Sequence, residues 1–269
     1  MEEGNKSPDL FETIVRERQQ RHDLYEQDVL ASLEFQNGLK YLQGISDHFL
    51  IAQSYVRLQG SRLSDWSSYL MLRFAPQFAE SVLAIGWNAK EGLQNPARRE
   101  LRFLLEAAVK CSARDFDTVA GTLEERLSGL NDREKRFEDY VVELRYFDDF
   151  EQPKAANDCL LSLYSELSRY VHPTEPQFLE AIHRAKKGET PGMESVATLN
   201  HFNKLAFRVF DLALVRIFYT IGPSMAGDIF TTVLDDEPDW RFHKGKFINQ
   251  MSRCFDYKHE RRIRRGEIT

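Results

Sequence analysis

The sequence has few of the residues that interrupt helices or close hairpins. Its 269 residues include only 14 Gly and 9 Pro, and the hairpin dipeptide Asn-Gly occurs once, at Asn37-Gly38, inside an otherwise helical pattern. A sheet protein of this length would need more turns. The sequence therefore predicts an all-α protein, a multi-helix bundle of about eight to ten helices with a long N-terminal helix.

Cysteine is scarce as well, and its placement predicts no metal site and no disulfide framework. The three cysteines, Cys111, Cys159 and Cys254, are odd in number and far apart, so they form no CxxC pair. The phosphate-binding and zinc-binding patterns GxxxxGK[ST], GxGxxG and HExxH are also missing. We therefore expect neither a metal ion nor a cofactor.

Targeting and membrane-spanning segments are missing in the same way. The first residues, MEEGNKSPDLFE, have neither a basic start nor an apolar core. The apolar run 207–219 is interrupted by Arg208, Asp211 and Arg216, and each such charge costs about 2.5 to 3.5 kcal/mol in a bilayer. The sequence thus predicts a cytoplasmic protein without a membrane partner.

Hydrophobic periodicity and helix punctuation predict the main elements. A first helix starts after Ser7-Pro8 and runs from Asp9 to about Gln43. Thr122 and Glu125 match a capping box. A helix from about 155 to 171 is stopped by His172-Pro173, because the residue before proline is pushed out of the α region.

The second half of the chain is expected to hold one long loop and one buried helix. The loop follows Glu175-Pro176, spans roughly twenty residues and ends near Gly192. The helix runs from about Thr198 to Ile221 and is almost entirely apolar. We divide the chain into an N-terminal helical arm (1–60), a helical core (61–225) and a basic C-terminal segment (226–269).

Charge is divided between the body and the end of the chain. The net charge is −6, but the segment 240–265 has nine Lys or Arg against two acids, which gives +7 and leaves −13 for the rest. Trp240, Phe242 and Tyr257 could stack on bases beside this charge. The segment is therefore a candidate surface for RNA or for an acidic partner protein, through five basic residues: Lys258, Arg261, Arg262, Arg264 and Arg265.

One helix end combines side chains that suit a phosphate. Ser165, Ser168, Arg169 and His172 follow one another at helical spacing, so two hydroxyls, a guanidinium and an imidazole share one stripe. A helix C-terminus favours the imidazolium form, which could donate a proton. In the alternative interpretation His172 caps the last carbonyls and Arg169 pairs with Glu166.

Two segments resemble a known superfamily. They are RRELRFLLEAAVKCSARD (98–115) and LYSELSRYVHPT (163–174), and the resemblance covers about Gln77 to Pro176. Together they are similar to bacterial all-helical proteins of the HEPN superfamily. The resemblance implies a helical protein of bacterial stress or phage defence, and some members are metal-independent ribonucleases that use an Arg and a His at a dimer interface.

The chain departs from that nuclease pattern at the decisive spacing. Arg169 and His172 lie closer together than the family's pair, and the pairs that do have its spacing, Arg16 with His22 and Arg253 with His259, are expected by chance. We therefore favour a non-catalytic interaction or regulatory protein that self-associates or binds a partner protein. The alternative is a ribonuclease that uses His172 with Arg169, or with Arg102 and Glu106.

A second nuclease pattern is weaker. Pro238-Asp239 followed by Asp256 and Lys258 resembles the metal-dependent PD-(D/E)xK nucleases, in which carboxylates hold Mg²⁺. That family places these residues on strands, whereas Arg253-Cys254-Phe255 lacks β-branched residues. A helical tail with Asp256 and Glu260 paired to arginines is the alternative.

Overall fold

The computed structural model describes residues 10–117, 121–131, 135–141, 153–186 and 192–255. Within these ranges it contains eleven α-helices, short 3-10 and π turns, and no strand, so the all-α prediction is confirmed. The helices are α1 (Leu10–Tyr25), α2 (Leu33–Gly60), α3 (Leu70–Arg73), α4 (Ala75–Lys90), α5 (Gln94–Asp117), α6 (Leu123–Ser128), α7 (Pro153–Ser168), α8 (Glu175–Lys186), α9 (Val196–Thr220), α10 (Gly222–Ile229) and α11 (Lys246–Arg253).

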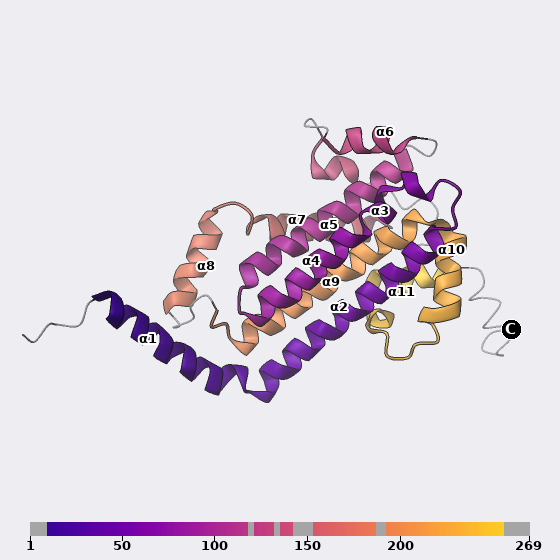
Figure 1. The fold of residues 1–269 in the computed structure, drawn as a ribbon. Helices are drawn as coiled ribbons and strands as arrows, with labels where there is room; N and C mark the ends of the chain where they lie inside the picture. The colour runs from indigo at the N-terminus through magenta and orange to yellow at the C-terminus, as the bar shows by residue number, and fades with distance from the viewer. Residues whose placement is uncertain (1–9, 118–120, 132–134, 142–152, 187–191, 256–269) are drawn as a thin grey trace, which may run out of the picture.

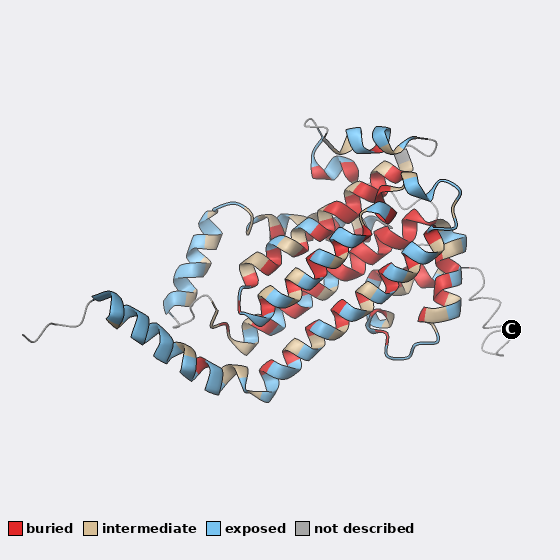
Figure 2. Ribbon diagram, viewed as in Figure 1, coloured by how far each residue is buried: buried red, intermediate tan, exposed pale blue. Residues whose placement is uncertain are grey.

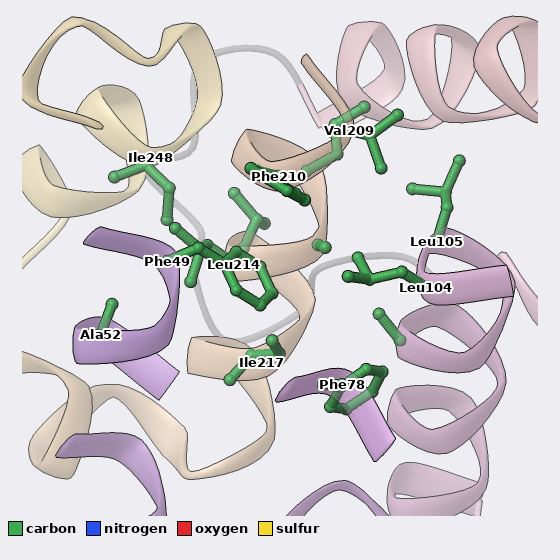
Figure 3. Packing of buried hydrophobic residues seen from close by; sticks show 14 of the residues in the cluster. Phe49, Ala52, Phe78, Leu104, Leu105, Val209, Phe210, Leu214, Ile217 and Ile248 are labelled. Carbon is green, nitrogen blue, oxygen red and sulfur yellow. The ribbon is translucent and has the colours of Figure 1, made fainter. Parts of the chain in front are cut away.

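Helix α9 lies at the centre of the bundle and contacts α2, α5, α7, α10 and α11. Every residue from Val209 to Thr220 is buried, as the apolar run predicts. Side chains of neighbouring helices meet it from several sides, among them Phe49 of α2, Leu104 of α5 and Ile248 of α11 (Figure 3). The predicted helix from about Thr198 to Ile221 is confirmed and forms the core.

The predicted long first helix is wrong, because it is two helices. A π-helical turn (Glu26–Leu30) follows α1, and α2 begins anew at Leu33. Ser32 has an extended backbone, and its hydroxyl accepts the N–H of Phe35 at 3.3 Å, which makes it an N-cap. Helix α1 therefore extends away from the bundle (Figure 1) and buries only Tyr25, whereas α2 packs on α4 and α9.

The predicted loop between Pro176 and Gly192 is also wrong, since α8 occupies most of it. Pro176 is the second residue of α8, where its missing N–H removes no intrahelical hydrogen bond. The preceding helix, α7, ends at Ser168 rather than at 171. The capping box of Thr122 and Glu125 is confirmed at the start of α6.

Aromatic side chains that follow α10 in the described part of the chain belong to the core. Trp240 and Phe242 are 3% and 0% exposed, and their rings lie 5.7 Å apart. The prediction that they stack on bases is therefore wrong, and Tyr257 lies outside the described residues. Among the helices that the structure describes, none combines the length and the apolar content needed to cross a bilayer. The division into an arm, a core and a basic segment stays a prediction.

Two buried aspartates hold short helices in place. Asp115 of α5 accepts the N–H groups of Leu70 and Met71 at the start of α3, at 2.8 and 2.9 Å, and pairs with Arg126 at 3.1 Å. Asp211 of α9 accepts the N–H groups of Phe247 and Ile248 at the start of α11, at 2.9 and 3.0 Å. Burial raises the pKa of each carboxyl to about 6, although these hydrogen bonds act in the opposite direction.

Candidate functional site

The predicted phosphate stripe lies at the end of α7, and only its outer members are open to solvent. Arg169 and His172 are exposed in the turn between α7 and α8. The imidazole of His172 bonds to none of the residues that the structure describes. Ser168 is half-buried, and its hydroxyl donates to the Tyr164 carbonyl at 2.6 Å. The stripe therefore presents a cation and an imidazole on the surface.

Arginines of α5, and not His172, interact with the carbonyl and the ring of Tyr170, which follows α7. Arg99 Nε donates to the Tyr170 carbonyl at 2.6 Å. The guanidinium of Arg98 lies 4.5 Å from the centre of the Tyr170 ring. The predicted capping role of His172 is thus wrong. The predicted pair of Arg169 with Glu166 is wrong too, because Glu166 faces Arg208 at 3.9 Å.

Arg102 and Glu106, the other predicted catalytic pair, form an ion ladder on the surface of α5. Arg102 Nη1 lies 3.2 Å from Glu106 Oε2, and Lys110 Nζ lies 2.7 Å from Glu106 Oε1. Arg102 also donates to Ser168 Oγ at 3.1 Å and to Tyr164 Oη at 2.7 Å. The structure therefore brings Arg102 to the stripe at Ser168, and each of the three guanidinium nitrogens has a protein partner.

Within the described residues, side chains of one face attach helix α8 to the bundle. Arg98, which is 2% exposed, lies 3.4 Å from Glu180 Oε1, and Tyr170 Oη donates to Glu180 Oε2 at 3.1 Å. Arg184 forms an ion pair with the buried Glu194. We call this side, residues Gln177, Glu180, Ala181, Arg184 and Ala185, the inner face of α8.

The opposite side of α8 carries its large apolar residues and faces solvent. Phe178, Leu179 and Ile182 are 62%, 58% and 51% exposed, and α8 has no buried residue (Figure 2). We call Glu175, Phe178, Leu179, Ile182 and Lys186 the outer face of α8. Sequence reasoning missed this surface because it assigned the segment to a loop. The spacing of Phe178, Leu179 and Ile182 was the available signal.

Helix α1 presents a second exposed apolar surface. Leu10, Ile14 and Val15 are all at least half exposed, and α1 lies at the same end of the molecule as α8 (Figure 1). Its attachment includes a hydrogen bond from Tyr25 Oη to the Glu194 carbonyl at 2.8 Å. Contiguous apolar surface of this kind is typical of an interaction site.

The remaining predicted residues are separated from this region or lie beyond the described part of the chain. Lys258, Arg261, Arg262, Arg264 and Arg265, and with them Asp256, Glu260 and His259, are outside the described residues. Asp239 is exposed in the loop before Trp240. The basic surface and the PD-(D/E)xK pattern therefore both stay predictions.

One group with the spacing of metal ligands occurs within the described ranges. It consists of His22, Asp23 and Glu26 on α1, whose ligand atoms lie within 4.8 Å of one another. His22 lies 3.7 Å from Glu26, and Gln19 donates to Asp23 at 2.9 Å. The group is open to water, so nothing in its surroundings selects a metal ion.

Comparison of the chain with protein-family models, curated proteins and solved structures gives no match. The fold and the side-chain geometry therefore carry the functional assignment.

Proposed function

We propose that the chain is a non-catalytic, HEPN-like interaction protein that assembles with a second copy through the outer face of α8. The main observation behind this proposal is that α8 is a helix of 12 residues with no buried residue and three large exposed apolar side chains. Helices this short are marginal in water by themselves and take most of their stability from packing of an apolar face. The outer face of α8 still lacks such packing among the described residues.

The charges of α8 favour a second copy as the occupant. Glu175 lies at its N-terminal end and Lys186 at its C-terminal end, and both are exposed on the outer face. In an antiparallel pair about a two-fold axis, Leu179 lies opposite Ile182 of the second copy, and Glu175 lies opposite Lys186 of the second copy. The same patch thus complements itself, as a two-fold interface requires.

Helix α1 would add to the buried area. A stable interface buries about 1,000 Å² or more, which exceeds what a pair of 12-residue helices covers. Leu10, Ile14 and Val15 provide further apolar surface at the same end of the molecule (Figure 1). The expected assembly is therefore a dimer in which α1 and α8 of both copies take part. A role in bacterial stress or phage defence follows from the HEPN resemblance and is part of this proposal.

The test is the mass of the protein in solution. The wild-type chain is expected to sediment with the mass of two chains at micromolar concentration. The double variant Leu179→Ser, Ile182→Ser is expected to sediment as one chain. Leu58→Ser is the matched control, because Leu58 of α2 is 59% exposed and Leu179 is 58% exposed. A monomeric wild type, or a dimer unaffected by the double variant, contradicts the proposal.

A metal-independent ribonuclease is the second candidate. It is favoured by one observation: Arg169 and His172 are both exposed in the turn after α7, and the imidazole of His172 bonds to none of the described residues. An imidazole in solvent is able to move a proton on a 2′-hydroxyl, and a guanidinium is able to stabilise the charge on phosphorus. Contact of RNA with the basic residues 258–265 is compatible with either candidate.

A further inference from the structure

The turn that follows Trp240 carries two cations on one side. Arg241 and Lys244 are the first and last residues of a 3-10 helix (Arg241–Lys244), and both are exposed. Side chains three residues apart in a 3-10 helix lie one above the other. Neither cation forms an ion pair with any residue that the structure describes. Like charges one turn apart repel each other, so an anion held between the two would stabilise this turn.

A cavity of about 620 Å³ lies beside this turn, against α2 and α9. Both Arg241 and Lys244 belong to its lining, together with Tyr41 and Gly44 of α2 and Phe207 of α9. This volume is in the range of cavities that hold small organic molecules. The two cations therefore border a space large enough for a ligand.

The guanidinium of Arg241 lies against the wall that α2 gives to the cavity. Its central carbon is 5.6 Å from the centre of the Tyr41 ring. Its Nε is 3.5 Å from the place that a Cβ on Gly44 would take. Burial raises the pKa of the Tyr41 hydroxyl, and the charge of Arg241 acts in the opposite direction. The guanidinium is therefore placed at the cavity wall, and its charge acts on a lining residue.

The backbone beneath this guanidinium is fixed by His48 of α2. His48 Nδ1 accepts the N–H of Arg241 at 2.9 Å, and the indole N–H of Trp240 donates to the His48 carbonyl at 3.4 Å. Burial, and then the charge of Arg241, lower the pKa of His48, which keeps Nδ1 available as an acceptor. A turn that is fixed before binding lowers the entropic cost of holding a ligand.

The charge and the shape of the lining suit a phosphate group on an organic molecule. One acid, Asp239, lines the cavity beside the two cations, and it forms no ion pair with either of them. A guanidinium offers parallel N–H donors that match phosphate oxygens, and an ammonium adds a point charge. Tyr41 and Phe207 are half-buried, and Phe207 is held by stacking on Phe242 at 5.2 Å, so they form an apolar wall.

We propose that this cavity binds a phosphate monoester with an aromatic group. Arg241 and Lys244 hold the phosphate oxygens, and the aromatic group lies against Tyr41 and Phe207. The site does not depend on the assembly proposed above, because none of its residues belongs to α1 or α8. Failure of either proposal therefore leaves the other in place.

Calorimetric titration of the full chain with phenyl phosphate tests this proposal. Inorganic phosphate lacks the ring and is expected to bind at least about tenfold more weakly, because the apolar contact is lost. Benzyl alcohol carries a ring without the phosphate and is also expected to bind at least about tenfold more weakly. No binding of phenyl phosphate, or binding no tighter than that of either comparison probe, overturns the proposal.

Variants of the lining locate the binding. Arg241→Gln and Lys244→Gln are each expected to weaken phenyl phosphate binding about tenfold, whereas Asp239→Asn is expected to strengthen it because a repelling charge is removed. Arg253→Gln is the matched control, since Arg253 is also exposed and lies outside the lining. Circular dichroism checks that all four variants are folded. Binding that survives both cation substitutions, or that Asp239→Asn weakens, overturns the proposal.

Discussion

The guanidinium of Arg99 donates a hydrogen bond to the backbone carbonyl of Tyr170, and the two atoms are 2.6 Å apart. Arg98 and Arg102 act on the same region, through the Tyr170 ring and through Ser168 respectively. Three arginines of one helix therefore position the end of α7. For Arg102 this is a structural use of a residue that the ribonuclease alternative would direct at a phosphate.

Because Arg102 bonds to protein groups, and because Arg169 and His172 depart from the nuclease spacing, we expect no RNA cleavage. Purified wild-type protein and the His172→Ala variant, incubated with total RNA in EDTA, should leave it equally intact. Electrophoresis of the RNA measures this. Cleavage that persists in EDTA and is lost in His172→Ala would support the ribonuclease instead. Cleavage that requires a metal and is lost in Asp256→Ala would support the PD-(D/E)xK pattern.

Asp115→Asn is expected to destabilise the fold by about 3 kcal/mol. The substitution removes the charge that faces Arg126, whose side chain is 0% exposed, and breaking a buried ion pair from one side is costly. It also weakens the cap of α3. Urea unfolding measures the change, with Asp65→Asn, at an exposed position, as the control. A loss below about 1 kcal/mol would show that Arg126 is stabilised by other groups.

The stability contributed by Asp211 depends on pH. Burial raises its pKa to about 6 in the folded protein, whereas an unfolded Asp has a pKa near 3.9. As the pH falls from 7 to 4.5, the Asp211 carboxyl takes up a proton more readily in the folded state than in the unfolded state. The free energy of unfolding therefore rises over this pH range.

Asp211→Asn removes this titration. The advantage of wild type over the variant is therefore expected to grow by about 2 kcal/mol between pH 7 and pH 4.5. Asp115 titrates in the same direction, but it is present in both proteins and cancels. Urea unfolding at both pH values gives the difference. A difference that stays constant or shrinks on acidification contradicts the assigned pKa.

Two glycine substitutions should have opposite effects. Gly86 lies inside α4, and no atom lies within 4 Å of the place that a new methyl group would take, so Gly86→Ala is expected to stabilise the protein by about 0.5 to 1 kcal/mol. Gly92 has a positive φ and faces the Gly192 backbone, so Gly92→Ala is expected to destabilise it by more than about 1 kcal/mol. Thermal unfolding of both variants checks the signs, and equal signs would contradict the geometry at Gly92.

The sequence is sufficient to predict the central helix and the fold class. The apolar run 207–219 can be stable only inside a core, and a near absence of hairpin signals leaves helices as the remaining regular structure. The capping box at Thr122 is also predictable, because both of its hydrogen bonds are local. Local patterns of this kind need no information about distant residues.

The errors arise where a local signal has two physical meanings. A proline inside a helix interrupts it, whereas a proline in the first turn is compatible with the start of a helix. Pro176 lies in the first turn of α8. The sequence around Ser32 fits a continuous helix, but in the structure its hydroxyl accepts the N–H of Phe35 and caps a new helix. The ion pair of Arg184 with Glu194 was not foreseen, because it joins α8 to the segment before α9 and no local pattern relates the two residues.

The charges at the two ends of α8 provide the most direct test of the proposed assembly. Sedimentation should give a dimer for wild type, and a dissociation constant raised about tenfold for Glu175→Lys or Lys186→Glu alone, because each places like charges opposite each other. The double variant with both substitutions should restore the wild-type dissociation constant. A monomeric wild type, or single variants that dimerise as tightly as wild type, would contradict the account.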